Sequence, residues 1–194
     1  MKAVLMSIQP KWCELIASGK KTVEVRKTRP KLEVPFKVYI YETKSVDRSR
    51  LVVYVDGNEP CRYYKGSGKV IGEFVCHLIG KTSWIKSPDH PMWVDGYDDE
   101  SCLTNRELYE YSKGDIFYEW HITDLVIYDK PMVLGEFKTF CDGLNPSKCD
   151  KCRYSYKENT ESGSYEECMC DGLKPMEIPP QSWCYVERSE SDGT

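Results

Sequence analysis

Residues 19–27 carry charged side chains at a spacing that suits a binding or catalytic site. The stretch reads Gly-Lys-Lys-Thr-Val-Glu-Val-Arg-Lys. The alternation over residues 22–26 is typical of a β-strand, with Thr22, Glu24 and Arg26 on one face and the valines on the other. The Cβ atoms of Glu24 and Arg26 would lie about 7 Å apart, close enough for the two side chains to pair.

Lys21 stands just before this predicted strand, where its cationic head would suit a phosphate or a carbonyl oxygen. With Glu24 nearby, the two side chains would also serve as an acid and base pair in a hydrolytic reaction. Two structural interpretations stay open. Lys21 would be an ordinary surface lysine, and Glu24 and Arg26 would form an ion pair that only holds the fold together.

Five of the ten cysteines crowd into residues 141–170, at spacings typical of a zinc site. Cys149 and Cys152 form one close pair, and Cys168 and Cys170 form a second about 15 residues later, an arrangement that closes a tetrahedral Zn²⁺ site. Because the pattern Cys-Asp-Gly-Leu-x-Pro occurs at both 141 and 170, Cys141 competes with Cys168 for the fourth position. Four thiolates leave no open position, so the zinc would be structural. Free thiols or a redox pair are the alternatives.

Aromatic and histidine side chains are further candidates for ligand contact. Trp84 and Trp93 lie in the aperiodic segment 81–101, where exposed rings would stack on bases. His121 alternates with Trp120 in a predicted strand, and a hydrogen-bonded structural histidine is the alternative there. The sequence has no Ser-His-Asp spacing, phosphate-binding loop or helical His-Glu-x-x-His motif, so classical hydrolase and kinase mechanisms lack support.

The elements that must position these residues are mostly strands. Strands are expected over 3–8, 22–26, 36–42, 51–55, 70–79, 117–122 and 125–128 (separate or as one bent strand), 137–140 and 181–187. Helices are expected over 11–18, between Pro10 and Gly19, and over 104–113, where Thr104 and Glu107 fit a capping box. So few helices exclude alternating βαβ units and predict an α+β domain or a small open barrel.

The composition describes a globular protein with a local basic region. No apolar run approaches the roughly 20 residues of a membrane span, and without a signal-peptide pattern we expect a cytoplasmic protein. Residues 1–40 hold nine Lys or Arg against three Glu, although the whole chain has a net charge of −4. Its densest basic run, Arg26, Lys27, Arg29 and Lys31, would neutralise the phosphates of a polyanion. A solvated basic surface is the alternative.

Four segments resemble one known family. The pattern Gly19-x-Lys21-x-x-Glu24-x-Arg26 resembles the G-x-K-x-x-E-x-R signature of the ASCH family, and residues 7–12, 120–125 and 179–187 resemble bacterial and phage members. The resemblance implies a PUA-like β-barrel whose first helix lies beside a cleft, with the signature residues lining that cleft. It also implies a nucleic acid or a modified nucleoside as the ligand.

One small group in the ASCH family is similar to amidohydrolases of acetylated cytidine. The resemblance implies that this chemistry relies on a Lys at the position of Lys21 and a Thr at the position of Glu24. This chain keeps the Lys and has Glu in place of the Thr. The substitution removes the proposed nucleophile and favours a binding protein over that enzyme.

The predicted organisation is an α+β, PUA-like mixed or antiparallel barrel with short flanking helices over residues 1–140. A zinc-binding knuckle follows at 141–175, then a terminal strand completing the barrel at 176–188 and a tail at 189–194.

We expect the chain to bind RNA or a modified nucleotide. The alternatives are a hydrolase of a modified nucleoside or RNA that uses Lys21 and Glu24, and a protein-interaction module. The candidate ligand-binding residues are Ser7, Gln9, Lys21, Glu24, Arg26, Lys27, Arg29, Trp84, Trp93 and His121. The candidate metal ligands are Cys149, Cys152 and Cys170, with Cys168 or Cys141 as the fourth.

The zinc site is testable on protein purified under reducing conditions. Metal analysis should find about one equivalent of zinc, and chelation should change the fold, because thiolate sites of this kind bind with about 10–16 kcal/mol. Cys149→Ser and Cys170→Ser should lose the metal, whereas Cys102→Ser, outside the cluster, should keep it. Less than about half an equivalent, with no change on chelation, would contradict the prediction.

Overall fold

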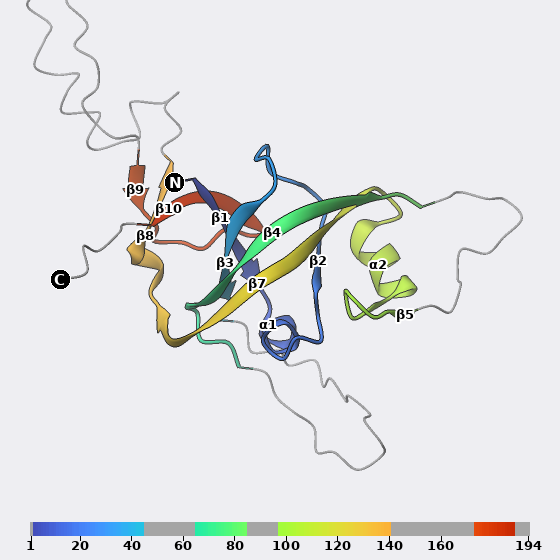
Figure 1. The fold of residues 1–194 in the computed structure, drawn as a ribbon, viewed down its shortest axis with the longest axis horizontal. Helices are drawn as coiled ribbons and strands as arrows, with labels where there is room; N and C mark the ends of the chain where they lie inside the picture. The colour runs from blue at the N-terminus through green and yellow to red at the C-terminus, as the bar shows by residue number, and fades with distance from the viewer. Residues whose placement is uncertain (1, 45–64, 85–96, 141–172, 189–194) are drawn as a thin grey trace, which may run out of the picture.

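The computed structural model describes residues 2–44, 65–84, 97–140 and 173–188 (Figure 1). The described residues form a mixed, mostly antiparallel β-sheet with two short α-helices. In chain order the elements are β1 (Ala3–Ile8), α1 (Pro10–Ala17), β2 (Val23–Arg26), β3 (Phe36–Glu42), β4 (Val70–Thr82), β5 (Tyr97–Asp98), β6 (Leu103–Thr104), α2 (Asn105–Ser112), β7 (Phe117–Met132), the 3₁₀ turn η1 (Leu134–Glu136), β8 (Phe137–Phe140), β9 (Leu173–Pro175) and β10 (Trp183–Arg188). Neither helix is long and apolar enough to cross a membrane.

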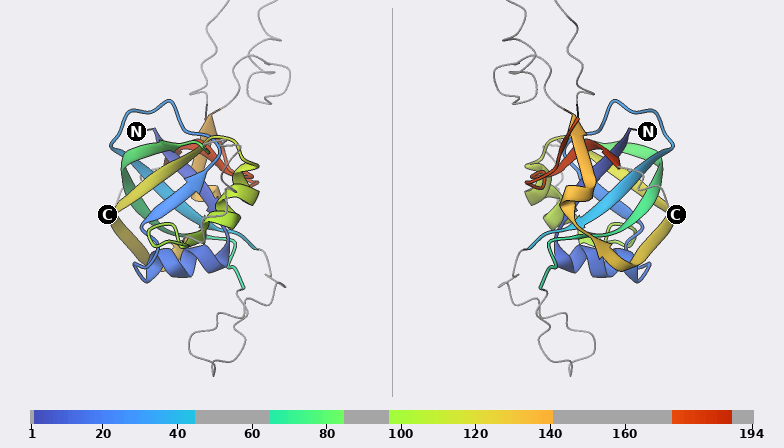
Figure 2. Two further views of the ribbon diagram at one scale, coloured as in Figure 1. Left: turned by 90° about the vertical axis from the view of Figure 1, so that its right-hand side faces the viewer. Right: turned by 90° about the vertical axis from the view of Figure 1, so that its left-hand side faces the viewer.

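Eight of these strands form one sheet in the order β2-β7-β4-β3-β1-β10-β8-β9. Among the described strands only β1 and β3 pair in parallel, and β1 pairs with β10 in the antiparallel sense on its other side. The sheet curls on itself, with α1 at one end and α2 beside it (Figure 2). The short β5 and β6 pair separately, next to α2.

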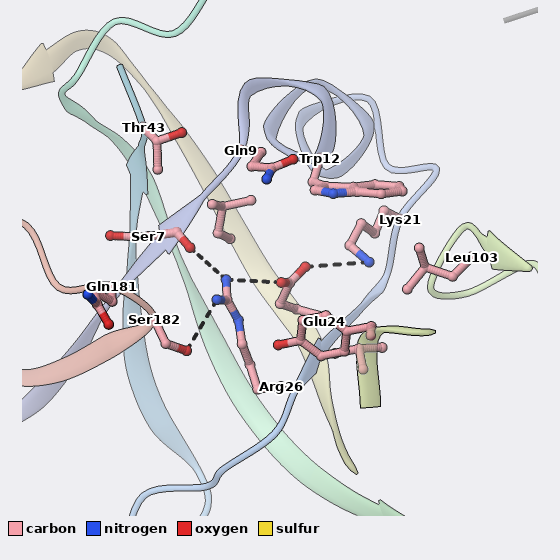
Figure 3. A pocket seen from close by; sticks show the side chains of 13 residues that line it. Ser7, Gln9, Trp12, Lys21, Glu24, Arg26, Thr43, Leu103, Gln181 and Ser182 are labelled. Carbon is pink, nitrogen blue, oxygen red and sulfur yellow. Dashed lines mark hydrogen bonds and ion pairs between the residues drawn. The ribbon is translucent and has the colours of Figure 1, made fainter. Parts of the chain in front are cut away.

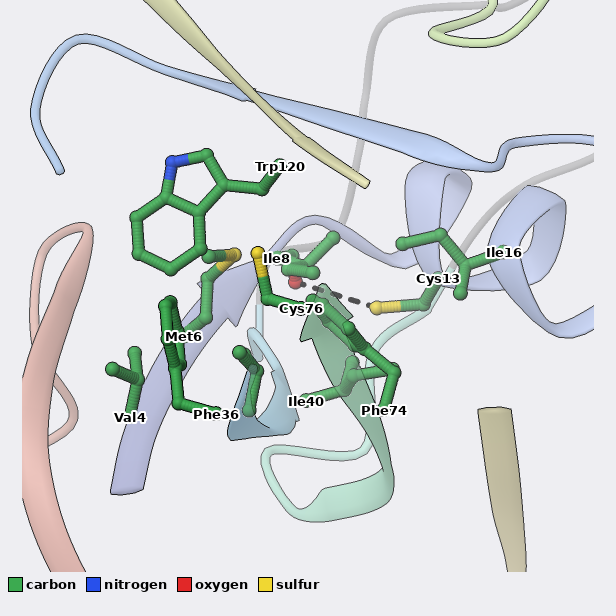
Figure 4. Close-up of a cluster of buried hydrophobic side chains, with 11 residues drawn as sticks. Val4, Met6, Ile8, Cys13, Ile16, Phe36, Ile40, Phe74, Cys76 and Trp120 are labelled. Atoms are coloured by element: carbon green, nitrogen blue, oxygen red, sulfur yellow. Dashed lines mark hydrogen bonds between the residues drawn. The ribbon is translucent and has the colours of Figure 1, made fainter. Parts of the chain in front are cut away.

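The main hydrophobic core lies inside the curled sheet. Val4, Met6 and Ile8 of β1 point into it and meet the fully buried Trp120 of β7 (Figure 4). Phe36 packs edge-on against Trp120, with ring centroids 5.6 Å apart. Ala3 and Leu5 of the same strand belong to a second buried cluster on the other face of the sheet. Burial on both faces explains why residues 3–6 of β1 form an unbroken apolar run.

Side chains rather than a backbone ladder join the β2 edge to the region of β10. The indole Nε1 of Trp183 donates to Thr28 Oγ1 at 3.0 Å, just after β2. The backbone N–H of Lys31 donates to the Tyr185 hydroxyl at 2.7 Å. The curl of the sheet is therefore held on this side by contacts between β10 and the segment that follows β2.

Most predicted elements are present, and the differences occur in the long strands. β4 continues to Thr82, beyond the expected end at 79, and residues 117–132 form the single strand β7. Asp124 takes a φ of 47° within β7, and the pairing of β7 with β4 shifts register on either side. Asp tolerates this conformation, so residues 117–132 form one strand with a bulge, as in the single-strand alternative expected from the sequence. Within the expected loop 81–101, Tyr97–Asp98 forms β5.

Several predictions fall outside the described residues: the strand at 51–55, Trp93 and the cysteine cluster with Cys141, Cys149, Cys152, Cys168 and Cys170. The zinc knuckle therefore stays a prediction. On either side of the cluster, β8 and β9 pair with each other, and Phe140 is the register partner of Leu173. Among the described residues, no three His, Cys, Asp or Glu side chains gather as a metal site.

The capping box of α2 is formed as the sequence predicts. Thr104 Oγ1 accepts from the backbone N–H of Glu107 at 3.2 Å, and Glu107 Oε2 accepts from the backbone N–H of Thr104 at 2.8 Å. Thr104→Ala should lower the free energy of unfolding by about 1 kcal/mol, because the backbone N–H of Glu107 loses its acceptor. Thr104→Ser should retain most of the stability that Thr104→Ala loses. Urea denaturation measures both, and equal stability of Thr104→Ala and the parent would contradict the assignment.

Candidate functional site

A glycine turn at the end of α1 positions the first signature residues. Gly19 has a φ of +73°, a conformation that would strain any residue with a side chain at this position, although the space around it is open. The turn lets the backbone N–H groups of Lys20 and Lys21 both donate to Leu15 O at 3.0 Å. It thereby reverses the chain and places the Lys21 ammonium near Trp12 of the same helix, 5.1 Å from the ring centroid.

Lys21 is buried, so the alternative of an ordinary surface lysine is wrong. Only 2% of the residue is exposed, and Nζ donates to the carbonyl oxygen of Ser101 at 2.6 Å. The neighbouring carbonyl of Glu100 accepts from the backbone N–H groups of Thr22 and Val23 at 2.9 and 3.0 Å. The turn between β5 and β6 therefore covers Lys21, while Thr22 itself is exposed and lies outside the pocket described below.

Three buried charges meet beside this lysine (Figure 3). Glu24 Oε2 lies 3.4 Å from Lys21 Nζ, and Glu24 Oε1 lies 3.0 Å from Arg26 Nη2. Glu24 is 6% exposed and Arg26 7%. The expected ion pair between Glu24 and Arg26 is thus present, and the group of three carries one net positive charge.

Arg26 also ties three separate parts of the chain together. Its Nη2 donates to the carbonyl of Ser7 in β1 at 2.7 Å, and its Nη1 donates to Ser182 Oγ at 3.3 Å. Ser7 in turn donates its hydroxyl to Pro180 O at 2.6 Å and its backbone N–H to Ser182 O at 2.8 Å. Most hydrogen bonds of the guanidinium therefore serve the fold, and Arg26 positions its neighbours.

These side chains line a pocket of about 540 Å³, which we call the signature pocket (Figure 3). Its walls come from α1, β1 and β2, from the segment before β10, and from β6 and α2. The lining residues are Ser7, Ile8, Gln9, Trp12, Lys21, Glu24, Val25, Arg26, Thr43, Leu103, Tyr111, Gln181 and Ser182. Five candidates from the sequence are among them: Ser7, Gln9, Lys21, Glu24 and Arg26. Their role in ligand binding stays a prediction.

The structure adds aromatic walls that the sequence interpretation did not assign to the site. Trp12 was not among the candidate ligand-binding residues, although it ends the segment 7–12, one of the four on which the family resemblance rests. Tyr111 comes from α2, 99 positions after Trp12. Burial raises the pKa of Tyr111 above its ordinary value, so its hydroxyl stays protonated at neutral pH. Nothing in the local sequence pattern distinguishes it.

Trp84 does not line the signature pocket. Its indole Nε1 donates to Ser112 Oγ at 2.8 Å, and its ring packs against Tyr109 and Phe117. The ring therefore stabilises the contact between α2 and β7, since its partners are buried or half-buried there. The other expected stacking residue, Trp93, lies outside the described residues.

The remaining candidates also lie outside the lining of the signature pocket. Lys27 is exposed, with Nζ 5.1 Å from the ring centroid of Tyr111, so it stands near the pocket wall. Arg29 is exposed and donates to Pro30 O at 3.4 Å. His121 on β7 packs edge-on against His77, with ring centroids 5.9 Å apart. Of the basic run, Arg26 therefore lines the pocket, and Lys27 stands beside its wall.

Two buried oxygens near Lys21 have no hydrogen-bond partner among the described residues. They are Glu24 Oε2 and Ser101 Oγ. Glu24 Oε2 lies within ion-pair distance of Lys21 Nζ, but the 3.4 Å contact does not have hydrogen-bond geometry. Buried polar atoms are rarely left unpartnered in folded proteins. The Glu24 carboxylate therefore retains an acceptor on the pocket wall, beside a cation.

These observations define a class of fold. It is a small curled, mostly antiparallel sheet with a charged pocket beside its first helix. The family model of the ASCH domain matches residues 6–117, more than half of the chain. The protein therefore belongs to the ASCH domain family. A search of curated proteins found no match.

Solved structures give a weaker likeness. The crystal structure of ASCH from Zymomonas mobilis is 21% identical, with a TM-score of 0.46, and the match covers 68% of this chain and 73% of that one. Two mutant proteins of the same ASCH give the same identity and TM-score, covering 69% and 68% of this chain and 77% and 74% of theirs. At this identity nothing about function transfers from them.

The role of Arg26 predicts a large loss of stability on its removal. Arg26→Met should lower the free energy of unfolding by about 3–5 kcal/mol, because the buried Glu24 carboxylate loses a partner. Lys27→Ala, at the exposed neighbouring position, should change it by no more than about 0.5 kcal/mol. Chemical denaturation measures both. If Arg26→Met is as stable as Lys27→Ala, the buried contacts of Arg26 do not hold the fold.

Proposed function

We propose that this ASCH protein binds RNA or a nucleotide by holding a nucleobase in the signature pocket. The observation that carries the proposal is the unpartnered, buried Glu24 Oε2 next to Lys21 Nζ. A lysine ammonium has three donors, and here one is used by Ser101 O. An acceptor and a donor therefore stand side by side on one wall.

This arrangement complements the edge of a nucleobase. Single-stranded bases are recognised by hydrogen bonds to their Watson–Crick edges, where an N–H donor stands next to an acceptor. The base would donate to Glu24 Oε2 and accept from Lys21 Nζ. Trp12 and Tyr111 supply aromatic surface in the same pocket, and stacking on such a ring contributes about 1–3 kcal/mol per base.

The charge around the pocket favours an anionic ligand. The three buried charges carry one net positive charge. Lys11 adds a second cation on the helix, 4.2 Å from the Trp12 ring centroid, and Lys27 adds a third near Tyr111. A local positive field raises the rate at which a phosphate-bearing ligand is captured and weakens with added salt.

A hydrolase is the second candidate, and the contact between Lys21 and Glu24 favours it. A lysine and a carboxylate 3.4 Å apart on one wall would act as acid and base on a bound nucleoside or on RNA. A module that binds an acidic protein is the third candidate. We also propose structural Zn²⁺ held by Cys149, Cys152 and Cys170, with Cys168 or Cys141 as the fourth ligand.

The proposal is tested by calorimetry at low salt. The ligands are AMP, CMP, GMP and UMP, their nucleosides and short RNA. At least one base should bind, and Trp12→Ala should weaken binding roughly tenfold because the stacking surface is lost. Glu24→Gln, checked for folding, should weaken it because the charged acceptor is lost. Trp84→Phe, an indole change outside the pocket, should leave the affinity unchanged.

The same series separates the three functions. Binding without turnover supports the nucleobase-binding protein. Turnover that Glu24→Gln abolishes while binding survives would establish the hydrolase. If no nucleotide, nucleoside or RNA binds at low salt, the proposal is wrong and the interaction module remains.

A further inference from the structure

A second pocket adjoins the signature pocket across a shared wall. It has a volume of about 480 Å³ and lies between the end of β3 and the segment that precedes β10. Ser7, Thr43 and Gln181 line both pockets, and we call these three residues the saddle. The other residues of the second pocket are Tyr41, Lys44, Gly68, Leu134, Glu177, Pro179 and Pro180.

The saddle is a fixed part of the structure. Ser7 is buried, its carbonyl accepts from Arg26, and its hydroxyl donates to Pro180 O at 2.6 Å. The backbone N–H of Thr43 donates to Ile8 O at 2.9 Å, which holds the chain after β3 against β1. The two pockets therefore keep their relative position without a ligand.

The second pocket has a cation at a defined place. The exposed Lys44 side chain lies across Gly68, where an added Cβ would come within 2.3 Å of Lys44 Cγ and 2.5 Å of its Cε. Gly68 has a φ of +67°, so both its conformation and its lack of a side chain suit this contact. The stem of Lys44 is thereby directed along the pocket wall and not freely into solvent.

The remaining surface is partly apolar and partly polar. Pro179, Pro180 and Leu134 are half-buried and supply apolar walls. Tyr41 is buried, and burial raises the pKa of its hydroxyl, which therefore remains a donor at neutral pH. Glu177 is exposed and offers an acceptor. Apolar walls with a few placed polar groups are typical of small-molecule sites, and volumes of about 300–1,000 Å³ are usual.

We propose that the two pockets take consecutive nucleotides of a single-stranded RNA, an inference that rests on the proposed function of the signature pocket. One base occupies the signature pocket, and the adjoining nucleoside occupies the second pocket. The phosphodiester between them crosses the saddle, where Gln181 and Thr43 line both pockets and Lys44 supplies the neutralising charge. The ligand of this protein is thus an oligonucleotide and not a free nucleoside.

A comparison of mononucleotides with dinucleoside monophosphates tests this inference in the full chain. For a base that binds the signature pocket, the best dinucleotide should bind at least about tenfold tighter than the mononucleotide. Lys44→Ala and Tyr41→Phe should each remove several-fold of that gain and leave the mononucleotide affinity unchanged. Lys130→Ala, which removes the same charge from an exposed site on β7, should preserve the gain.

The outcomes distinguish the two proposals. If mononucleotides bind but dinucleotides bind no tighter, the second pocket is not a nucleotide subsite, although the signature pocket still is. If Lys130→Ala lowers the gain in affinity as much as Lys44→Ala does, general electrostatics explains the gain. The assignment of the second pocket as a nucleotide subsite is then also wrong. If neither mononucleotides nor dinucleotides bind, the proposed function itself fails.

Discussion

The buried guanidinium of Arg26 is the contact on which both the sheet and the pocket depend. It pairs with Glu24 on its own strand, reaches the Ser7 carbonyl on β1 and contacts Ser182 before β10. Arginine suits this position because its planar fork of donors satisfies several acceptors at fixed angles, which a lysine ammonium does less well. The same contacts fix the pocket wall, so fold and site share one set of hydrogen bonds.

Burying three charges together is costly, and their retention needs a reason. Desolvation of such groups often exceeds what their mutual attraction returns, and apolar replacements are frequently as stable. A core built only for stability would therefore not need Lys21, Glu24 and Arg26 at 2%, 6% and 7% exposure. A binding site gains from this arrangement, because side chains already ordered lose little entropy when a ligand arrives.

Local sequence patterns predicted the parts of the fold that depend on neighbours in sequence. The apolar residues of β1 and β3, the alternation in β2 and the capping box of α2 are all visible within short windows. The burial of Lys21 could not be seen in a short window, because Ser101, which accepts its hydrogen bond, lies 80 positions away. Tyr111 and Gln181 also reach the pocket only through the fold. Lys21, Glu24 and Arg26 were predicted because they stand in the family signature, and Ser7 and Gln9 because they stand in the segment 7–12 that resembles the same family.

The order of the strands has a consequence for how the protein is made. β1 pairs with β10, so that Ala3 is the register partner of Val186, and the Ser7 hydroxyl bonds to Pro180, 173 positions later. Pairings between such distant segments form late, because the chain must first be brought together over a long separation. During synthesis this edge of β1 therefore stays unpaired until β10 has left the ribosome. A chain cut before residue 180 would keep the signature motif and still lack the wall that completes its pocket.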